Sequence, residues 1–219
     1  MGRAKDIRVE PISSADANRI IRALHYSSKV VPNSQLHFGV FLDGRCGGAM
    51  QFGPSMRQDL TAGLVHGTRP REFLELNRLA FADWLPRNGE SRCIAFALRA
   101  IRKQYPHIKW VISFADATQC GDGTIYRAAG FLLTNIKPNV GLRTNPRTGE
   151  VVQSMQAYHL GLQYEYKKWV ALPGFQLRYV YFLHPNELAN LAVDVIPYSQ
   201  ISEAGATMYK GKKPSAPVA

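Results

Sequence analysis

Apolar and polar positions follow a regular order between residues 72 and 131. Apolar residues dominate Leu74–Phe81 and Trp110–Phe114, which predicts two strands. Between these segments, apolar positions recur at i, i+3, i+4, i+7 and i+11 from Ile94, which predicts an amphipathic helix that ends before Pro106. A strand, a crossover helix and a second strand place the two strands parallel, with the helix on one face. This segment therefore predicts the centre of an α/β (mixed α+β) fold.

The flanking patterns extend the predicted sheet. Residues 6–12 predict an edge strand, and residues 36–42 and 45–52, joined by Asp43-Gly44, predict a hairpin. Residues 175–183 predict a terminal strand. Helices are expected after the cap residue Ser13 or Ser14 and at residues 124–129, with one helical turn in the loop at 57–71. We expect a central twisted mixed sheet flanked by helices.

The chain is expected to form one domain over residues 1–207. Within it, residues 137–175 are rich in turn-forming and basic residues, which indicates a long excursion. Residues 208–219 combine lysines and prolines and predict a disordered basic tail.

The charge is strongly positive. Lysine and arginine number 27 against 16 aspartate and glutamate residues, a net charge of +11. Such an excess is typical of proteins that bind polyanions, although a solvated basic surface is the alternative. The candidate contacts are the cations of the 57–71 loop and those interleaved with tyrosines farther on: Arg57, Arg69, Arg71, Arg143, Arg147, Lys167 and Lys168. The loop is equally well explained as a plain connection, and at least half of the tyrosines as core residues.

No membrane partner is expected. The chain lacks an apolar run long enough to span a bilayer and an N-terminal signal peptide. Its three cysteines have no paired spacing, which is typical of reduced thiols in a cytoplasm.

A turn and two side chains are candidates for chemistry. The turn at Arg87, Asn88, Gly89 and Ser91 places backbone N–H groups at a helix N-terminus, where a phosphate or pyrophosphate binds well. Tyr126 follows the second strand, so its hydroxyl is expected to face a cleft at the strand ends. Arg78 stands inside an apolar strand, so it either faces a polar cleft or meets an acid such as Asp116 or Glu75.

The segment Tyr126–Phe131 resembles the end of the cofactor-binding half of the GNAT acyltransferase superfamily, which corresponds here to residues 72–131. The resemblance implies a GNAT-like sheet with a basic C-terminal extension, and acetyl-CoA or another CoA thioester bound at the 87–91 turn. This turn departs from the superfamily pattern, because Pro86 replaces Gln or Arg and Ser91 replaces the last small residue.

A closer resemblance is to the Mom family of bacteriophage DNA-modification proteins. Five segments carry it: Leu24–Ser27, Glu75–Leu79, Asn88–Ser91, Ser113–Ala117 and Tyr126–Phe131. The resemblance implies an enzyme of transferase type in the cytoplasm of the bacterial host. Such an enzyme converts adenine in double-stranded DNA to N6-carbamoylmethyladenine, which protects phage DNA from restriction. Its target adenine must be flipped out of the duplex.

Two assignments of the site remain open. In the first, His25, Tyr26 and Asp116 are ligands of a catalytic iron, as the resemblance implies. In the second, Tyr126 donates a proton, Asp116 is the base, and Arg78 and Ser91 hold the cofactor or substrate. Without the resemblance, His25 is explained by its position at a helix C-terminus.

Two other functions also remain open: a conventional N-acetyltransferase acting on a protein or small amine, and a non-catalytic DNA-binding accessory protein. The sequence leaves a homo-oligomer open as well.

Overall fold

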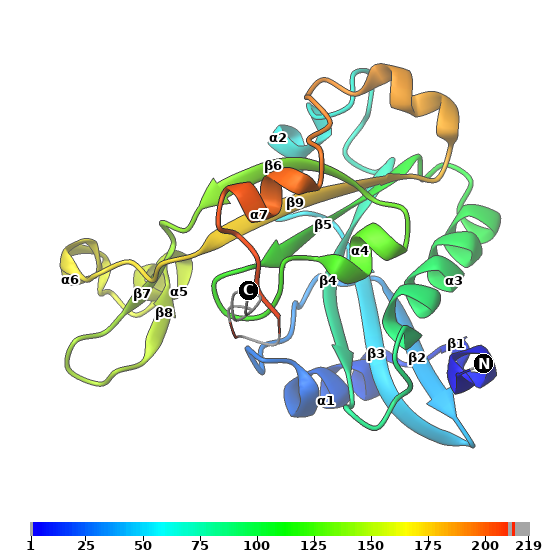
Figure 1. Cartoon of the computed structure of the whole chain (residues 1–219), viewed down its shortest axis with the longest axis horizontal. Coiled ribbons are helices and arrows are strands. Elements are labelled where there is room, and N and C mark those ends of the chain that lie inside the picture. The colour runs from blue at the N-terminus through cyan, green and yellow to red at the C-terminus, as the bar shows by residue number, and fades with distance from the viewer. Residues whose placement is uncertain (1, 210–211, 213–219) are drawn as a thin grey trace, which may run out of the picture. The chain divides into compact units, whose positions relative to one another are not determined.

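The computed structural model describes residues 2–209 and 212, and a seven-stranded mixed sheet organises them (Figure 1). The strand order is β1-β2-β3-β4-β5-β9-β6. The strands β1 to β4 pair antiparallel, whereas β4 and β5 pair parallel. The mixed α/β class, the edge strand, the hairpin and the parallel pair are thus confirmed. Their bounds are Arg8–Pro11 (β1), Leu36–Leu42 (β2), Arg45–Gly53 (β3), Phe73–Phe81 (β4), Trp110–Asp116 (β5), Leu132–Pro138 (β6) and Phe175–Phe182 (β9).

Helices connect these strands. A second sheet consists of two strands, Leu142–Thr144 (β7) and Val151–Gln153 (β8). None of the helices in the described residues has the length and apolar character needed to cross a bilayer. Their bounds are Ser14–Leu24 (α1), Gln58–Ala62 (α2), Gly89–Gln104 (α3), Thr124–Ala128 (α4), Ser154–His159 (α5), Gln163–Lys168 (α6) and Ser199–Glu203 (α7), with 3₁₀ helices at Arg3–Asp6 (η1) and Pro185–Asn190 (η2).

The chain groups into two compact units. The first comprises residues 1–114, 123–134 and 178–197, and the second comprises residues 115–122, 135–177 and 198–219. In the first unit, Ala17 and Ile21 of α1 pack on Ala49 of β3 and Ala80 of β4. The helix α1 begins at a side-chain cap, in which Ser13 Oγ accepts the Asp16 N–H at 3.1 Å. The cap fixes where the helix begins, and therefore which of its side chains face these strands.

The second unit has a small core of its own. Val152, Ala157, Tyr166 and Trp169 are buried together, with Leu162 against them. The prediction of a turn-rich excursion at 137–175 was therefore incomplete, since the segment forms β7, β8, α5 and α6. These elements are only three to six residues long, so each is too short to show a clear period in sequence.

The prediction that a disordered tail begins at residue 208 is wrong for that residue. Met208 is buried, and its carbonyl oxygen accepts the Asp122 N–H at 3.1 Å. A buried side chain and a backbone hydrogen bond are not features of a disordered tail. Tyr209 and Lys212 also form an isolated bridge, and the other tail residues lie outside the described residues.

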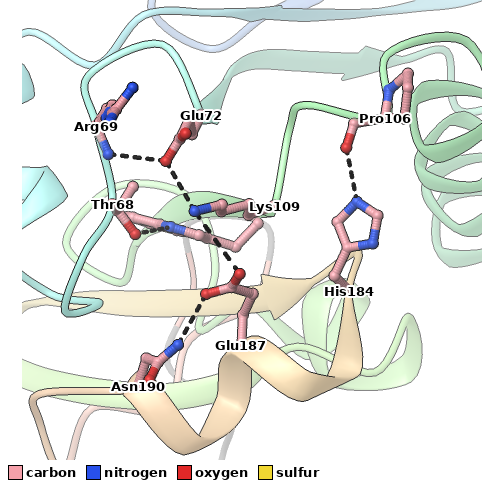
Figure 2. Close-up of polar contacts among 9 residues, drawn as sticks. Thr68, Arg69, Glu72, Pro106, Lys109, His184, Glu187 and Asn190 are labelled. Atoms are coloured by element: carbon pink, nitrogen blue, oxygen red, sulfur yellow. Dashed lines mark hydrogen bonds and ion pairs between the residues drawn. The ribbon is translucent and has the colours of Figure 1, made fainter.

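Polar contacts hold together the amino-terminal ends of β4 and β5 (Figure 2). Lys109 Nζ lies 2.9 Å from Glu72 Oε2 and 3.8 Å from Glu187 Oε1. The Lys109 N–H donates to Glu72 O at 2.7 Å, and Asn190 Nδ2 donates to Glu187 Oε2 at 3.0 Å. Lys109 thus joins the start of both strands to η2.

The same two strands diverge after a short paired stretch. Their register comprises Phe73↔Trp110, Leu74↔Val111 and Glu75↔Ile112, although β4 continues to Phe81. Beyond Glu75, β4 has no further partner in β5 among the described residues, so the two strands form a fork that is open toward the carboxy-terminal end of β4.

Candidate functional site

The strand β4 contains one extra residue. Gln51 of β3 pairs with Arg78, but the next residue, Phe52, pairs with Leu76, so Asn77 forms a β-bulge. Gly53 then pairs with Glu75. Residues 51 and 53 of β3 share one face because strand side chains alternate. Their partners, Arg78 and Glu75, are therefore brought to that same face.

Contacts of the bulged residue fix its position. Ser34 Oγ donates to Asn77 Oδ1 at 3.1 Å, and Asn77 Nδ2 donates to Pro54 O at 3.5 Å. A Cβ on Gly53 would lie 2.8 Å from Asn77 Oδ1 and 2.8 Å from Asn33 O. The bulge therefore requires glycine at position 53 to admit the asparagine side chain.

The guanidinium of Arg78 ties β4 to the loop after α1. Its Nε donates to Lys29 O at 2.8 Å and its Nη1 to Asn77 O at 2.7 Å. Within the described residues it forms no ion pair and its Nη2 forms no hydrogen bond. Burial lowers the pKa of Arg78, and the neighbouring Tyr26 and Glu75 oppose this effect. The predicted acid partners thus do not bind the arginine directly, which leaves Nη2 as a donor for a ligand.

His25 and Tyr26 lie at the end of α1. Their rings stack at 4.4 Å between centroids, and the Tyr26 side chain is 51% exposed. Burial, and secondly the charge of Arg78, lower the pKa of His25 to about 4. The Ser27 N–H donates to His25 Nδ1 at 3.2 Å, and the Ser27 hydroxyl lies 2.9 Å from the same nitrogen. His25 is consequently neutral at pH 7, and donation from the Ser27 N–H favours the tautomer with its proton on Nε2.

Glu75 is the acid of this face. Burial raises the pKa of Glu75, while hydrogen bonds with Ser55 and Asn77 and the charge of Arg78 oppose the rise. A carboxyl group shifted in this way beside an arginine is typical of functional sites.

A polar row crosses the sheet beside this cluster. His37 pairs with Gln51, and Gln51 pairs with Arg78, so the three residues lie side by side on one face. Gln51 Nε2 donates to Asn18 Oδ1 of α1 at 2.9 Å and lies 3.3 Å from His37 Nδ1. Gln51 is fully buried, and its Oε1 has no hydrogen-bond partner in the described part of the chain.

The predicted iron stays a prediction. A metal binds an imidazole nitrogen through its lone pair, and the contacts of Nδ1 with the Ser27 N–H and hydroxyl leave Nε2 of His25 as the nitrogen that could hold one. No group of three or more His, Cys, Asp or Glu side chains gathers elsewhere among the described residues. We therefore derive no step through iron.

The predicted cofactor turn forms the start of α3. Asn88 is its N-cap residue, in the left-handed region with φ of 64°, and Gly89 is buried. The Gly89 N–H donates to Pro86 O at 3.0 Å, and Arg87 is exposed. A pocket of about 410 Å³ adjoins this turn; it is lined by Ala4, Lys5, Asn88, Ser91, Arg92, Ala95, Arg99 and Ala128. Three cations therefore surround two of the predicted cofactor residues.

Asp116 and Tyr126 have other neighbours. Asp116 Oδ1 accepts the N–H groups of Thr118 at 3.0 Å and Gln119 at 3.3 Å, and this turn ends β5. The Tyr126 ring is buried against Phe131 and Tyr179, with centroids 5.5 and 5.4 Å away. The structure thus gives Asp116 a role in a turn and Tyr126 a role in an aromatic cluster, and their catalytic roles stay predictions.

The predicted DNA contacts divide into exposed and occupied cations. Arg57, Arg69 and Arg71 are exposed in the loop that contains α2, and Arg147, Lys167 and Lys168 are exposed in the second unit. Arg143 is occupied, because its Nη1 donates to Trp169 O at 2.6 Å and to Lys167 O at 3.2 Å.

Sequence reasoning considered Glu75 only as a partner for Arg78 and missed Gln51 and His37 entirely. One signal was available, since the adjacent polar residues at 77 and 78 break the alternation of apolar and polar positions that runs from Leu74 to Asn77. Such a break indicates a bulge.

Comparisons with known proteins agree with the resemblance. A model of the Mom protein family matches residues 6–200. The methylcarbamoylase mom of Escherichia phage Mu is 43% identical over 129 residues, which are 58% of this chain and 53% of that protein. The chain thus spans about half the length of this curated relative.

Solved structures of acetyltransferases are more distantly similar. The ribosomal-protein-S18-alanine N-acetyltransferase from Escherichia coli has a TM-score of 0.48 at 10% identity, covering 81% of this chain and 94% of that chain. A GNAT family acetyltransferase from Elizabethkingia anophelis with acetyl-CoA bound has a TM-score of 0.44 at 9% identity, covering 81% and 98%.

Proposed function

The chain belongs to the Mom protein family, and we propose that it is a DNA-modification enzyme that converts adenine in double-stranded DNA to N6-carbamoylmethyladenine. The phage Mu relative is named a methylcarbamoylase, which supports a group of this kind as the one transferred. The modification would protect phage DNA from restriction in the cytoplasm of the bacterial host.

One observation carries the proposal: the polar cluster at the open end of the β4–β5 fork. The bulge at Asn77 brings Glu75 and Arg78 to one face, and burial and the charge of the neighbouring Arg78 hold His25 neutral. The exposed ring of Tyr26, stacked on His25, offers a flat surface on which a flipped base can stack. The cluster thus combines an aromatic surface for a base, a neutral donor in His25, a cationic donor in Arg78 and, in Glu75, a carboxyl group whose pKa burial raises.

The chemistry requires a nitrogen to become a nucleophile. Adenine N6 is weakly nucleophilic because its lone pair is delocalised into the ring. The new bond joins N6 to the methylene carbon of the carbamoylmethyl group, so one N6 proton leaves as the bond between that carbon and a leaving group of the donor breaks. Glu75 is the group that we assign to take this proton, since burial raises the pKa of its carboxyl. Arg78 Nη2 and His25 Nε2–H are the donors that we assign to hold the carbonyl oxygen of the transferred group or an acceptor atom of the base.

A CoA thioester is the cofactor that we propose for the turn at the start of α3. Asn88 and Ser91 line the 410 Å³ pocket together with Lys5, Arg92 and Arg99, and cations of this kind suit phosphate groups. Acyl transfer from a thioester alone would give an amide, so the donor of the carbamoylmethyl group must also carry a leaving group on its methylene carbon. Ser91 and the cations would bind and orient the CoA portion. The Gly89 N–H donates to the Pro86 carbonyl oxygen, so we do not assign this N–H to the cofactor.

The DNA would be held through its phosphates. The exposed arginines at 57, 69 and 71 lie in one loop of the first unit, and no ion pair engages their guanidinium groups within the described residues. Phosphate contacts of this type are independent of base sequence and weaken with salt.

Mass spectrometry of nucleosides tests the proposed function. Plasmid DNA from cells that express the wild-type protein is expected to contain adenine enlarged by a carbamoylmethyl group. The Arg78→Met variant is expected to lose this product, whereas the control Arg102→Met, at an exposed position of α3, is expected to retain it. Unmodified DNA from cells with folded wild-type protein would contradict the proposal.

A further inference from the structure

The helix α6 exposes an aromatic side chain next to two cations. Tyr164 is 72% exposed, and Lys167 and Lys168 follow it by three and four positions, so the three side chains share one side of the helix. Neither lysine forms an ion pair in the described part of the chain. This side of α6 is therefore unpartnered, apolar in part and positively charged.

Arg143 holds α6 in place without contributing to that side. Its Nη1 binds the carbonyl oxygens of Lys167 and Trp169, and its guanidinium lies 5.3 Å from the centre of the Tyr166 ring. The Tyr166 hydroxyl in turn donates to Gly141 O at 2.7 Å. The end of α6 that carries the two lysines is thus fixed before any partner binds. Arg143 is a positioning residue, and we omit it from the predicted DNA contacts.

The helix α5 adds a second exposed ring. Tyr158 is 66% exposed and makes an edge contact with the neighbouring His159, at 6.0 Å between centroids. The shared core and the hydrogen bond from the Leu162 N–H to Ala157 O, at 2.8 Å, hold α5 against α6. The two helices form a rigid hairpin with a tyrosine exposed on each.

From this arrangement we infer that the α5–α6 hairpin is a platform for unpaired DNA bases. Tyr164 stacks on a base, Lys167 and Lys168 bind the adjoining phosphates, and Tyr158 provides a second stacking ring. Aromatic rings interleaved with cations suit nucleic acid with exposed base faces, whereas a fully paired duplex offers such a ring only phosphates and groove edges. The net charge of +11 attracts a polyanion, so it favours DNA as the partner over a protein surface with few acidic residues.

The inference deepens the proposed function and rests on it. An enzyme that extrudes adenine binds DNA that is locally unpaired. A platform for unpaired bases would make the complex with opened DNA more stable than the complex with closed duplex.

Binding measurements with two DNA probes test the platform. A fluorescent duplex with one unpaired adenine is compared with the fully paired duplex of the same sequence, by anisotropy at fixed salt. The wild-type protein is expected to bind the first probe more tightly, and Tyr164→Ala is expected to weaken that binding by roughly 5- to 100-fold, the range for loss of one stacked base. Tyr164→Phe keeps the ring and is expected to bind like the wild type, as is Val170→Ala, which alters an exposed apolar side chain in the same unit.

Three other outcomes would contradict either the platform or the proposed function. Equal affinity of Tyr164→Ala and the wild type for the unpaired probe would overturn the platform while leaving the proposed function intact, because phosphate contacts would then account for binding. Dissociation of a dimer by Tyr164→Ala, with DNA affinity unchanged, would assign the surface to a second copy of the chain and would also overturn the platform. A folded wild-type protein with no affinity for either probe would overturn the proposed function itself.

Discussion

Glu75 and Arg78 lie on the same face of β4, although residues three positions apart in a regular strand face opposite sides. The bulge at Asn77 is the cause, and it lies where β4 loses its pairing with β5. Bulges commonly redirect side chains next to active sites. Here the redirected pair consists of an acid and a cation that the same strand would otherwise have separated.

Replacing Arg78 by lysine tests the geometry of the guanidinium apart from its charge. Lysine keeps the charge but cannot donate at once to Lys29 O and Asn77 O and still present a further N–H. We expect modification activity to fall by about 10- to 100-fold in kcat/KM, the size expected for a lost charge-assisted contact. Arg102→Lys on α3 is the control. Full activity of Arg78→Lys would show that only the charge is needed.

Replacing Gly53 by alanine tests the bulge. The new Cβ would lie 2.8 Å from Asn77 Oδ1, Asn33 O and Ser34 Cα, two of which are backbone atoms of a tied loop. We expect destabilisation by about 1–3 kcal/mol, typical of overpacking, in urea unfolding, and loss of activity. Gly63→Ala, where the nearest atom to the new Cβ is 3.4 Å away, should change neither. An active, fully stable Gly53→Ala protein would contradict the proposed role of the bulge.

The ionisation of His25 is expected to make stability depend on pH. Burial and Arg78 lower the pKa of His25 from 6.5 to about 4, so between these values the unfolded chain binds the proton more readily. His25 therefore contributes stability that is fully present above pH 6.5 and is lost as the pH falls toward 4. Unfolding free energies measured across this range should fall less steeply in His25→Gln than in the wild type.

Proton NMR of the imidazole provides the direct check on His25. A midpoint near 4 is expected in the wild type, and a higher midpoint in Arg78→Met because the arginine charge contributes to the shift. An unchanged His25 midpoint in Arg78→Met would show that the two side chains do not interact.

Lys109 is expected to stabilise the closed end of the fork modestly. It bridges Glu72 and Glu187 (Figure 2), but its side chain is 28% exposed, so solvent weakens the ion pairs. Lys109→Met should lower the free energy of unfolding by about 0.5–1 kcal/mol, less at high salt. Denaturant unfolding at two salt concentrations measures this. Loss of Arg3 from its exposed pair with Asp43 should have no measurable effect.

Arg99 tests the cofactor pocket at the start of α3. It lines the 410 Å³ pocket with Lys5 and Arg92, whereas Arg102 on the same helix does not line it. Arg99→Ala is expected to weaken CoA binding about 3- to 10-fold, as loss of one exposed phosphate contact would, and Arg102→Ala to leave it unchanged. Calorimetric titration measures both, and equal affinities would place the cofactor elsewhere.

Periodicity predicted much of the first unit because long elements repeat their pattern several times. The helix expected from Ile94 to Tyr105 is observed as α3, Gly89–Gln104, and the hairpin at 36–52 is observed as β2 and β3. The two short strands and two short helices of the second unit escaped prediction. Their stability comes from a shared core around Tyr166 and Trp169, and such contacts leave little trace in a local window.

The sequence by itself determined the fold class, the parallel strand pair with its crossover helix and the excess of positive charge, and it predicted His25, Tyr26 and Arg78 as site residues through their family motifs. Only the tertiary structure decided which groups act together. The bulge at Asn77 depends on room above Gly53, the neutrality of His25 on burial and Arg78, and the role of Arg143 on carbonyl oxygens more than 20 residues away in sequence. Each of these depends on distances between segments remote along the chain, and a pattern of neighbouring residues does not encode such distances.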